Sequence, residues 1–406
     1  MLDLLALTDS GVYRGIVVLL TLYPIWLPLV LAAVFWEHWL DYVRANFIKE
    51  QGSVLLEIRL PIDIVKNPKA MEIFYTALYQ TGTATYIETY IKGKVKPWFS
   101  IEMCSFGGQI KFFIWTWPKY RNLVETQLYG QFPSIEIIEA PDYTKNVHHD
   151  PVNLPLWGTN FKMVRDQAFP LKTYFDYGLH TDPKEEYKID PMTSTIEFLG
   201  SAQKGEQIWI QILFQAHKKM GLKEGEIIHE PLWTKESRHE IEQMTNKLRG
   251  ESEYPRPLTE GERDLVAAME RKVMKWPFEV MIRGFYIATK EANRINLMIA
   301  GLLGSFRQYS APDGFNEIKV GKFTDYDYPW QDFRRQRRDM VEKKMLDAYK
   351  KRSYFNYPYE NFRGKRYILS TEELATIFHF PGRVATTPTF DRIVSKKGEP
   401  PANLPI

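Results

Sequence analysis

The sequence predicts an α+β protein in which an N-terminal transmembrane helix precedes two tandem ferredoxin-like (split βαβ) domains. Three features support this prediction: a charge-free apolar run near the N-terminus, an order of strands and helices that occurs twice, and a basic helical segment followed by a Pro-rich tail. The predicted parts are a membrane anchor with a juxtamembrane helix at 1–50, a first domain at 51–145, a second domain at 146–325 with a helical insertion at 230–276, a basic helix and short docking helix at 326–382, and an extended tail at 383–406.

The apolar run extends from Ile16 to Phe35 and contains no charged residue. A helix of this length, at about 1.5 Å per residue, matches a hydrocarbon core roughly 30 Å thick. The run leads into Trp36-Glu37-His38-Trp39, an interface-like pattern without the small-residue cleavage site of a signal peptide. Pro24 and Pro28 leave two shapes open, a kinked single span and a re-entrant hairpin.

Basic residues predict how the anchor is oriented. Arg14 alone precedes the run, whereas Arg44 and Lys49 follow it. The positive-inside rule therefore places a single-pass protein in the cell (inner) membrane with the bulk of the chain in the cytoplasm. A single cysteine, Cys104, agrees with a reducing compartment, because it excludes an internal disulfide.

The region after the anchor shows the β-α-β-β-α-β order of a ferredoxin-like unit. Alternating and β-branched runs predict the strands, and Asn-Pro and Pro signals predict where the helices begin. The predicted elements are strands at 53–60, 98–105, 109–117 and 135–139 and helices at 67–79 and 119–131.

A second copy of this order follows, with an insertion between its middle strands. Repetition of one supersecondary unit at this scale indicates a duplication. The predicted elements are strands at 172–177, 207–216, 278–289 and 316–323, helices at 193–201 and 291–307, and two inserted helices at 234–248 and 259–275.

A cluster of positive charge occupies the predicted helix at 332–352, although the whole chain carries a formal net charge of only +3. Such a helix is commonly just a solvated face with i to i+4 pairs. As a contact surface it would bind either anionic lipid headgroups or a nucleic acid, with salt-sensitive affinity. The candidate contact residues are Arg334, Arg335, Arg337, Arg338, Lys343 and Lys344.

The sequence gives no defensible catalytic, cofactor or metal site. Gly200 to Glu206 lacks the Lys-Ser/Thr ending of a phosphate-binding loop. His148-His149-Asp150 would need further ligands from elsewhere in the fold to hold a metal. Cys104 lies in a predicted strand, which favours a buried, inert thiol. We therefore expect a protein that is not an enzyme and that binds no cofactor.

One segment resembles a known family. The residues Ile368–Pro381 (ILSTEELATIFHFP), with Thr387–Thr389 and Lys396–Pro405, are similar to the segment just before the motor domain of bacterial type IV secretion and conjugative DNA-transfer ATPases of the HerA/FtsK-like superfamily. Glu206–Gln211 and Ser105–Pro133 also resemble the membrane-proximal region of such proteins. In that family a motor strand and a Walker A loop follow, and this sequence has neither, so no ATP-binding residue is carried over.

The same segment predicts a short helix with a capping signal and an apolar docking face. The candidate docking residues are Leu374, Ile377, Phe378 and Phe380. The resemblance implies a non-catalytic, membrane-anchored scaffold that docks a cytoplasmic ATPase in a type IV secretion or DNA-transfer-like system, with a homo-oligomer as a further expectation. Two alternatives stay open: a structural membrane protein unrelated to DNA transfer, and a membrane-bound enzyme whose site the sequence does not reveal.

Overall fold

The computed structural model describes residues 11–61, 67–82, 84–180, 190–218, 233–249, 256–311, 314–326 and 328–381. Within these ranges the chain forms two compact units. Of the described residues, one unit comprises those up to 50 and 84–95, and the other comprises those within 51–82 and 96–381. The tail predicted at 383–406 lies outside the described residues.

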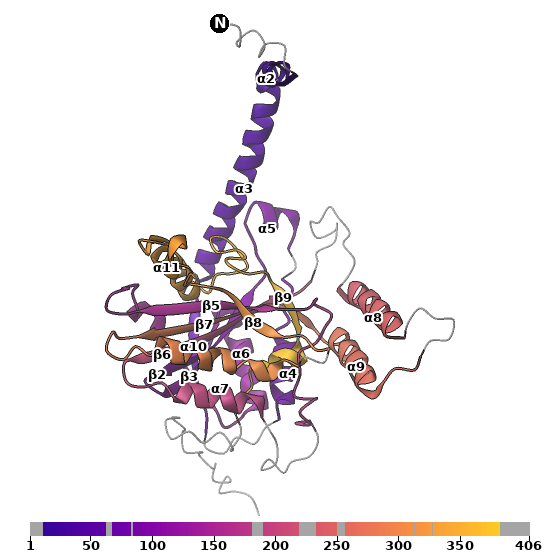
Figure 1. Cartoon of the computed structure of the whole chain (residues 1–406), viewed down its shortest axis with the longest axis vertical. Coiled ribbons are helices and arrows are strands. Elements are labelled where there is room, and N and C mark those ends of the chain that lie inside the picture. Colours follow the sequence, from indigo (N-terminus) through magenta and orange to yellow (C-terminus); the bar gives the residue numbers. More distant parts are fainter. Residues whose placement is uncertain are drawn as a thin grey trace, which may run out of the picture. The chain divides into compact units, whose positions relative to one another are not determined.

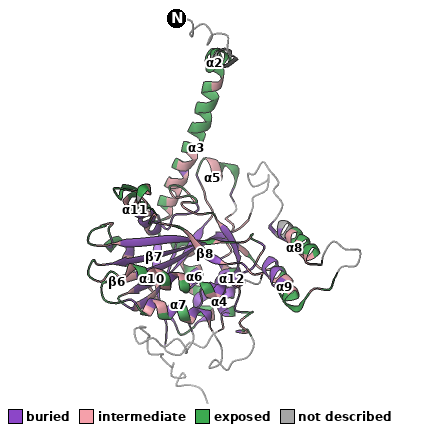
Figure 2. Cartoon of the chain, viewed as in Figure 1, coloured by how far each residue is buried: buried purple, intermediate pink, exposed green. Residues whose placement is uncertain are grey.

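The N-terminal unit consists of helices α2 (Gly11–Thr21), α3 (Tyr23–Gln51) and the short α5 (Tyr86–Tyr90). The segment that carries α5 packs on the C-terminal half of α3, where the Trp39 indole nitrogen donates to the Tyr90 carbonyl at 3.2 Å. Gly93, at φ +66°, allows this close approach, because a Cβ there would lie 2.3 Å from the backbone of Val43. The apolar side chains of α2 and of the first half of α3 are exposed (Figure 2).

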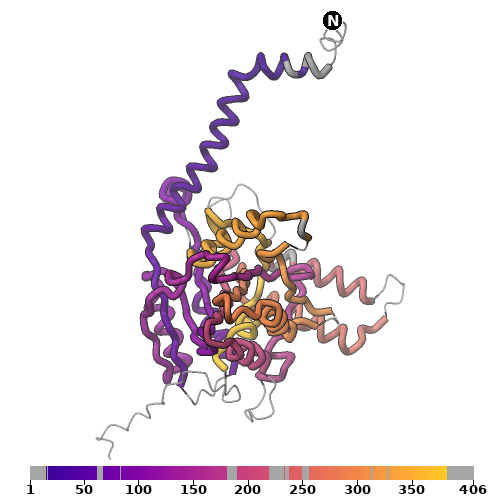
Figure 3. Tube along the Cα trace, turned by 60° about the vertical axis from the view of Figure 1, so that its left-hand side comes forward, coloured from indigo at the N-terminus to yellow at the C-terminus, as the bar shows by residue number. Residues whose placement is uncertain are grey.

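The prediction of a transmembrane helix is wrong. In the described part of the chain, no helix is both long enough and apolar enough to cross a membrane. The apolar run is divided at Leu22 between α2 and α3, and these helices point in different directions (Figure 3). The apolar part of α3 contains Pro28 and ends at Trp36, since Glu37 and His38 follow. The prediction used the length and the hydropathy of the whole run, and neither quantity shows that the run is divided between two helices.

The second unit is built on one antiparallel sheet, whose nine strands all belong to the described residues. Eight of them lie in the order β4-β1-β3-β2-β6-β7-β5-β8, and β9 pairs with the first residues of β7. The strands are β1 (Val54–Arg59), β2 (Trp98–Phe106), β3 (Gln109–Thr116), β4 (Glu136–Glu139), β5 (Leu156–Met163), β6 (Glu206–Ala216), β7 (Pro277–Ala288), β8 (Ile318–Phe323) and β9 (Tyr367–Ser370).

This topology corrects the prediction of two tandem domains. The first four strands and the next four have mirror-related orders around the β2–β6 pair, so each half keeps a β-α-β-β-α-β connectivity. The halves nevertheless share one sheet, because β2 and β6 pair along their whole length, from Trp98 opposite Gln215 to Phe106 opposite Gln207. Backbone hydrogen bonds therefore cross the expected domain boundary without a break.

The first strand of the second half also differs from its prediction. The segment at 172–177 forms turns, since the Asp176 carboxylate accepts hydrogen bonds from the backbone nitrogen and the hydroxyl of Thr173 at 2.8 and 3.1 Å. The strand in its place is β5, which pairs with β7 and β8. Its sequence, LWGTNFKM, contains a Gly and an Asn that weaken the strand signal.

Helices cover both faces of the sheet in this unit (Figure 1). One face is covered by α4, α6, α7, α10 and α12, and the other by α11 with the loop after it. The helices of this unit are α4 (Lys69–Ala77), α6 (Arg121–Gln131), α7 (Pro191–Gly200), α8 (Trp233–Arg249), α9 (Glu260–Met274), α10 (Ile295–Gly304), α11 (Gln336–Lys350) and α12 (Thr371–Ile377), with 3-10 turns at Pro118–Tyr120, Tyr143–Asn146, Arg307–Tyr309 and Pro329–Gln331.

The core lies on both sides of the central strands, because successive strand residues point to opposite faces. On the face under α4, the rings of Phe99 and Phe214 stack with centroids 5.6 Å apart. On the face under α11, the Trp209 ring lies 5.3 Å from that of Tyr349. Both faces of β2, β6 and β7 are consequently buried, as Figure 2 shows.

Candidate functional site

The predicted basic residues lie at the start of α11 and on its outer face. The helix begins at Gln336, later than the sequence predicts, because Arg335 has a left-handed backbone at φ +56°. The Asp332 carboxylate accepts from the backbone nitrogen of Arg338 at 2.7 Å, which satisfies a donor in the first turn. Arg334 and Arg335 therefore precede the helix, and the other predicted residues lie within it.

Five of the six predicted cations are exposed: Arg334, Arg335, Arg337, Lys343 and Lys344. The exception is Arg338, which is half-buried and bonds to Glu342 at 2.8 Å and to Asp325 at 3.1 Å. Burial alone would lower the pKa of Arg338, but the hydrogen bond and the charge of Glu342 raise this pKa above its usual value. Arg338 is thus part of the internal ion pairing and not of the outer surface.

Exposed aromatic side chains adjoin these cations. Phe333 is 83% exposed, Trp330 is 65% exposed and Tyr328 is 51% exposed. The rings of Tyr328 and Trp330 stack with centroids 4.5 Å apart and an interplanar angle of 13°. We call these three residues, the five exposed cations and the exposed Met340 the basic–aromatic surface.

Sequence analysis found the cations of this surface but missed its aromatic residues. The signal was present, since the segment YPWQDF stands directly before RRQRR. A run of aromatic residues is more often core than surface, and only the structure shows that these side chains face outward.

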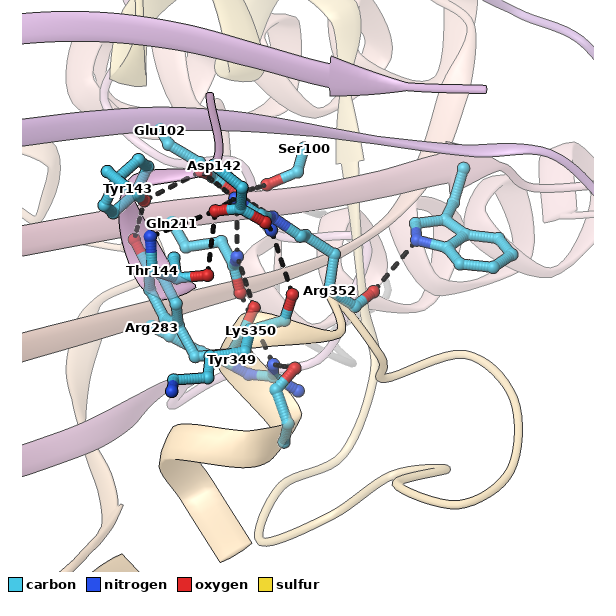
Figure 4. Close-up of polar contacts among 12 residues, drawn as sticks. Ser100, Glu102, Asp142, Tyr143, Thr144, Gln211, Arg283, Tyr349, Lys350 and Arg352 are labelled. Atoms are coloured by element: carbon cyan, nitrogen blue, oxygen red, sulfur yellow. Dashed lines mark hydrogen bonds and ion pairs between the residues drawn. The ribbon is translucent and has the colours of Figure 1, made fainter. Parts of the chain in front are cut away.

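A buried ionic network fastens α11 to the sheet beneath it (Figure 4). Arg352, just after the helix, donates from Nε and Nη2 to the Glu102 carboxylate of β2 at 2.9 and 3.0 Å. Arg352 also bonds to the Asp142 carboxylate. The side chains of Arg352 and Glu102 are 1% and 0% exposed. Burial disfavours the charge of Arg352, but the facing Glu102 carboxylate raises its pKa well above its usual value.

Neutral groups complete the bonding of Glu102. Its carboxylate accepts from the Ser100 hydroxyl at 2.8 Å, the Tyr143 hydroxyl at 2.8 Å and the Gln211 amide at 2.9 Å. A buried carboxylate is tolerated when its lone pairs are used in this way. The network joins residues up to 250 positions apart, so no local pattern in the sequence predicts it.

A second buried arginine, Arg283 of β7, shares the Gln211 side chain with this network. It donates to the carbonyls of Ala348 and Ser353 at 3.0 and 2.7 Å and to the Gln211 amide oxygen at 3.4 Å. Burial lowers the pKa of Arg283 to about 10, which leaves it charged at neutral pH. The partners of Arg283 are thus neutral groups, whereas Arg352 pairs with the carboxylates of Glu102 and Asp142.

The predicted docking residues lie in the core. Leu374, Ile377, Phe378 and Phe380 are all buried, and the Phe378 ring packs 5.7 Å from Phe112 of β3. The predicted cap of α12 is present, because the Ser370 hydroxyl accepts from the Glu373 backbone nitrogen at 3.3 Å. These apolar side chains are therefore covered by neighbouring elements of the chain itself, and a partner could not reach them in the folded state.

One group in the described part of the chain has side chains suited to hold a metal ion: His149, Asp339 and Glu342, with ligand atoms within 4.8 Å of one another. The His149 Nε2 lies 3.2 Å from Glu342, which also accepts from Arg338. Two of the three side chains are thus joined to each other, and Glu342 is already paired with Arg338. The neighbouring Asp150 instead accepts from the backbone nitrogens of Val152 and Asn153, at 3.1 Å each.

An open cleft of about 580 Å³ lies beside β8. Its floor is apolar, and its charged groups include Lys319 and Glu317, which pair with each other at 2.8 Å. Cys104 lies elsewhere, fully buried in β2, and burial raises the pKa of its thiol well above the usual value. Neither feature offers an activated nucleophile.

The fold and its surfaces define an α+β protein with a single large antiparallel sheet, a buried ionic network and an outward basic–aromatic surface. Residues 44–393 match the model of a family described as a domain of unknown function, DUF8128, and the chain belongs to that family. No curated protein matches the chain.

Proposed function

We propose that this protein is a non-catalytic scaffold that docks a cytoplasmic ATPase of the DNA-transfer kind. The observation that carries the proposal is that the buried carboxylates have their hydrogen-bonding and ionic partners within the fold. In the described ranges, each of the buried glutamates has a hydrogen-bonding or ionic partner: Glu72, Glu102, Glu206, Glu279, Glu342, Glu372 and Glu373.

Catalytic acids and bases instead usually face a cleft with part of their bonding capacity unused. Here the partners are side chains of neighbouring elements, as with Glu206 of β6, which bonds to Arg294 and to the Tyr286 hydroxyl. Desolvation would raise the pKa of Glu206, but Arg294 lowers it below its usual value. Such pairs hold elements together, which is what a scaffold requires.

The ATPase partner rests on the resemblance of Ile368–Pro381 to the segment before a motor domain. In this fold the segment forms β9 and α12 within the core. The resemblance places the motor after this segment, so the proposal assigns the contact to the chain that follows Pro381. The tail at 383–406 is therefore the proposed docking element. A cytoplasmic location belongs to the same proposal and is supported by the single cysteine, Cys104.

The test compares the full chain with a variant that ends at Pro381, each tagged and purified under native conditions from the cells that produce it. We expect the full chain to retain a P-loop ATPase, identified by mass spectrometry and by Mg-ATP hydrolysis in the eluate. The truncated variant should lose both signals while keeping its far-UV circular dichroism. Recombinant full chain alone should hydrolyse no ATP.

Two results would contradict the proposal. One is ATP hydrolysis by the recombinant chain alone, which would make it an enzyme. The other is equal recovery of the ATPase with the truncated variant, which would place the contact outside the tail.

A further inference from the structure

We propose that the basic–aromatic surface binds the surface of a bilayer that contains anionic phospholipids. The proposal concerns residues 328–344 of the second unit and does not depend on the scaffold function. It rests on three observations: uncompensated cations, protruding apolar side chains beside them, and a rigid attachment of α11 to the sheet.

The cations of this surface are not neutralised by the acids around them. Arg334, Arg335, Lys343 and Lys344 form no ion pair within the described part of the chain. Of the described carboxylates nearby, Asp325 and Glu342 bind Arg338, Asp332 caps α11, and Asp339 forms no ion pair with these four cations. Positive charge therefore faces outward, and lysines and arginines near an anionic leaflet strengthen binding to it.

The outward cations of α11 share one face with an apolar side chain. Arg337 and Lys344 are two helical turns apart, and Met340, 56% exposed, lies between them. Phe333 and Trp330 protrude just before the helix. Aromatic side chains beside cations suit the headgroup region, where the rings enter the apolar boundary and the cations meet phosphates.

The same geometry disfavours a nucleic acid. A single strand is bound in a basic groove by aromatic faces left open for stacking on bases. Tyr328 and Trp330 instead stack on each other, nearly parallel. Met340 has no ring, and Phe333 stands out from the surface at 83% exposure. Protruding apolar side chains match insertion into lipid.

The surface is held in place before any partner arrives. Arg352, at the C-terminal end of α11, is fixed to Glu102 and Asp142, and Tyr349 packs on Trp209 of the sheet. A preformed surface binds without a large ordering cost. The basic–aromatic surface is thus already formed when it binds the anionic bilayer.

The first test measures co-flotation of the full chain with vesicles. Anionic vesicles contain about 30% phosphatidylserine, and neutral vesicles contain phosphatidylcholine alone. The test variant carries Arg334→Gln, Arg335→Asn, Lys343→Gln and Lys344→Gln; asparagine is used at 335 because it tolerates the left-handed backbone there. The control carries Lys162→Gln, Lys204→Gln, Arg263→Gln and Lys290→Gln, four exposed cations elsewhere.

Both variants lose four positive charges, so a difference between them reports position and not net charge. We expect the test variant to lose at least about tenfold in affinity for anionic vesicles and the control to lose less than about threefold. Binding of the parent chain should weaken with salt. Neutral vesicles measure any binding by other apolar side chains, including those of α2 and α3, and should not distinguish the variants.

The second test asks whether the aromatic residues enter the lipid. Phe333→Cys is labelled with an environment-sensitive dye, and Met274→Cys on α9, 80% exposed, serves as the matched site. The buried Cys104 should remain unlabelled, which the parent chain verifies. We expect anionic vesicles to shift the emission of the dye at 333 to the blue and to leave the dye at 274 unchanged.

Three results would overturn the proposal. The first is equal loss of binding by the test and control variants, and the second is an unchanged emission at 333 on bound vesicles. The third is displacement of the chain from anionic vesicles by single-stranded oligo(dT) that binds at least tenfold more tightly and loses its affinity in the test variant, which would assign the surface to nucleic acid.

Discussion

At the residue scale, Arg352 is the side chain on which the buried network depends. It balances two carboxylates from different elements, and its own backbone adopts φ +47° to place the guanidinium under the sheet. Removing one partner of a buried ion pair leaves the other charge without compensation, which is far costlier than losing an exposed pair. This difference can be measured with two adjacent residues.

We predict that Arg352→Met lowers the free energy of unfolding by about 3–5 kcal/mol. Lys351→Met is the control, because Lys351 is exposed, pairs with Asp347 and lies over the Tyr359 ring, so its loss should cost less than about 1 kcal/mol. Urea denaturation followed by tryptophan fluorescence compares them. Equal costs for the two variants would show that the network does not stabilise the fold.

His379 gives a prediction about pH. Its Nδ1 faces the Ala375 carbonyl at 2.9 Å, and its Nε2 faces both oxygens of Asp190 at 3.1 Å. Both nitrogens meet acceptors, which favours the doubly protonated ring. Burial lowers the pKa of His379, but the Asp190 carboxylate more than offsets this, so the pKa is raised above 6.5.

A raised pKa of His379 stabilises the fold fully below about pH 6.5 and loses this contribution as pH rises through the folded-state pKa. The partner Asp190 has a lowered pKa, so its contribution disappears as pH falls below about 3.8. We predict that the stability difference between the parent chain and His379→Gln is largest near pH 5–6 and shrinks toward pH 9, as measured by urea midpoints. A difference independent of pH would contradict the assignment.

At the element scale, α12 depends on its N-terminal cap. Ser370 and Glu373 exchange hydrogen bonds, and Glu373 also pairs with the buried Lys272 of α9 at 3.1 Å. The cap therefore satisfies backbone groups that water cannot reach. The short helix α5 has the same type of capping box, formed by Thr85 and Glu88, but this one is exposed.

We predict that Ser370→Ala lowers the free energy of unfolding by about 1–2 kcal/mol, at the upper end of the range for lost caps. Thr85→Ala removes the equivalent hydroxyl where water can replace it, and it should cost less than about 1 kcal/mol. Thermal unfolding by circular dichroism tests the pair. A larger effect at Thr85 would contradict the role of burial.

Elements with strong periodicity could be predicted from the sequence, and elements decided by tertiary contacts could not. The predictions at 98–105 and 109–117 differ from β2 and β3 by one residue at the C-terminal end. The prediction at 172–177 failed because Asp176 closes a turn on Thr173, an interaction that competes with a strand.

The candidate site likewise contains residues that could be predicted from the sequence and residues that could not. Its cations form a run that composition reveals, whereas the exposure of Phe333 and the pairing of Arg352 with Glu102 depend on how distant elements pack. The periodicity of α12 predicted one apolar face, whereas all seven residues of the helix are buried inside the chain's own fold.

At the scale of the whole molecule, the continuous sheet predicts cooperative unfolding of the second unit. The β2–β6 pair joins its two halves with a complete ladder, so neither half ends at a free edge there. Two separate domains would lose their structure independently. A shared sheet couples the halves.

We predict that Ile101→Ala in β2 and Ile282→Ala in β7, both fully buried, shift one common transition by about 2–5 kcal/mol each. Fluorescence and far-UV circular dichroism should give coincident urea curves for both variants. Two resolved transitions, each moved by only one of the substitutions, would contradict a single cooperative sheet.

The mirror order of the strands also bears on solubility. Pairing β2 with β6 places the hydrogen-bonding edges of both strands inside the sheet, and the sheet order ends at shorter strands, β4 and β8. Glu136 and Glu139 bound β4, and β8 carries Lys319 and Lys322. Short, charged edges resist pairing with another chain. A sheet large enough to template aggregation thus ends in strands that discourage it.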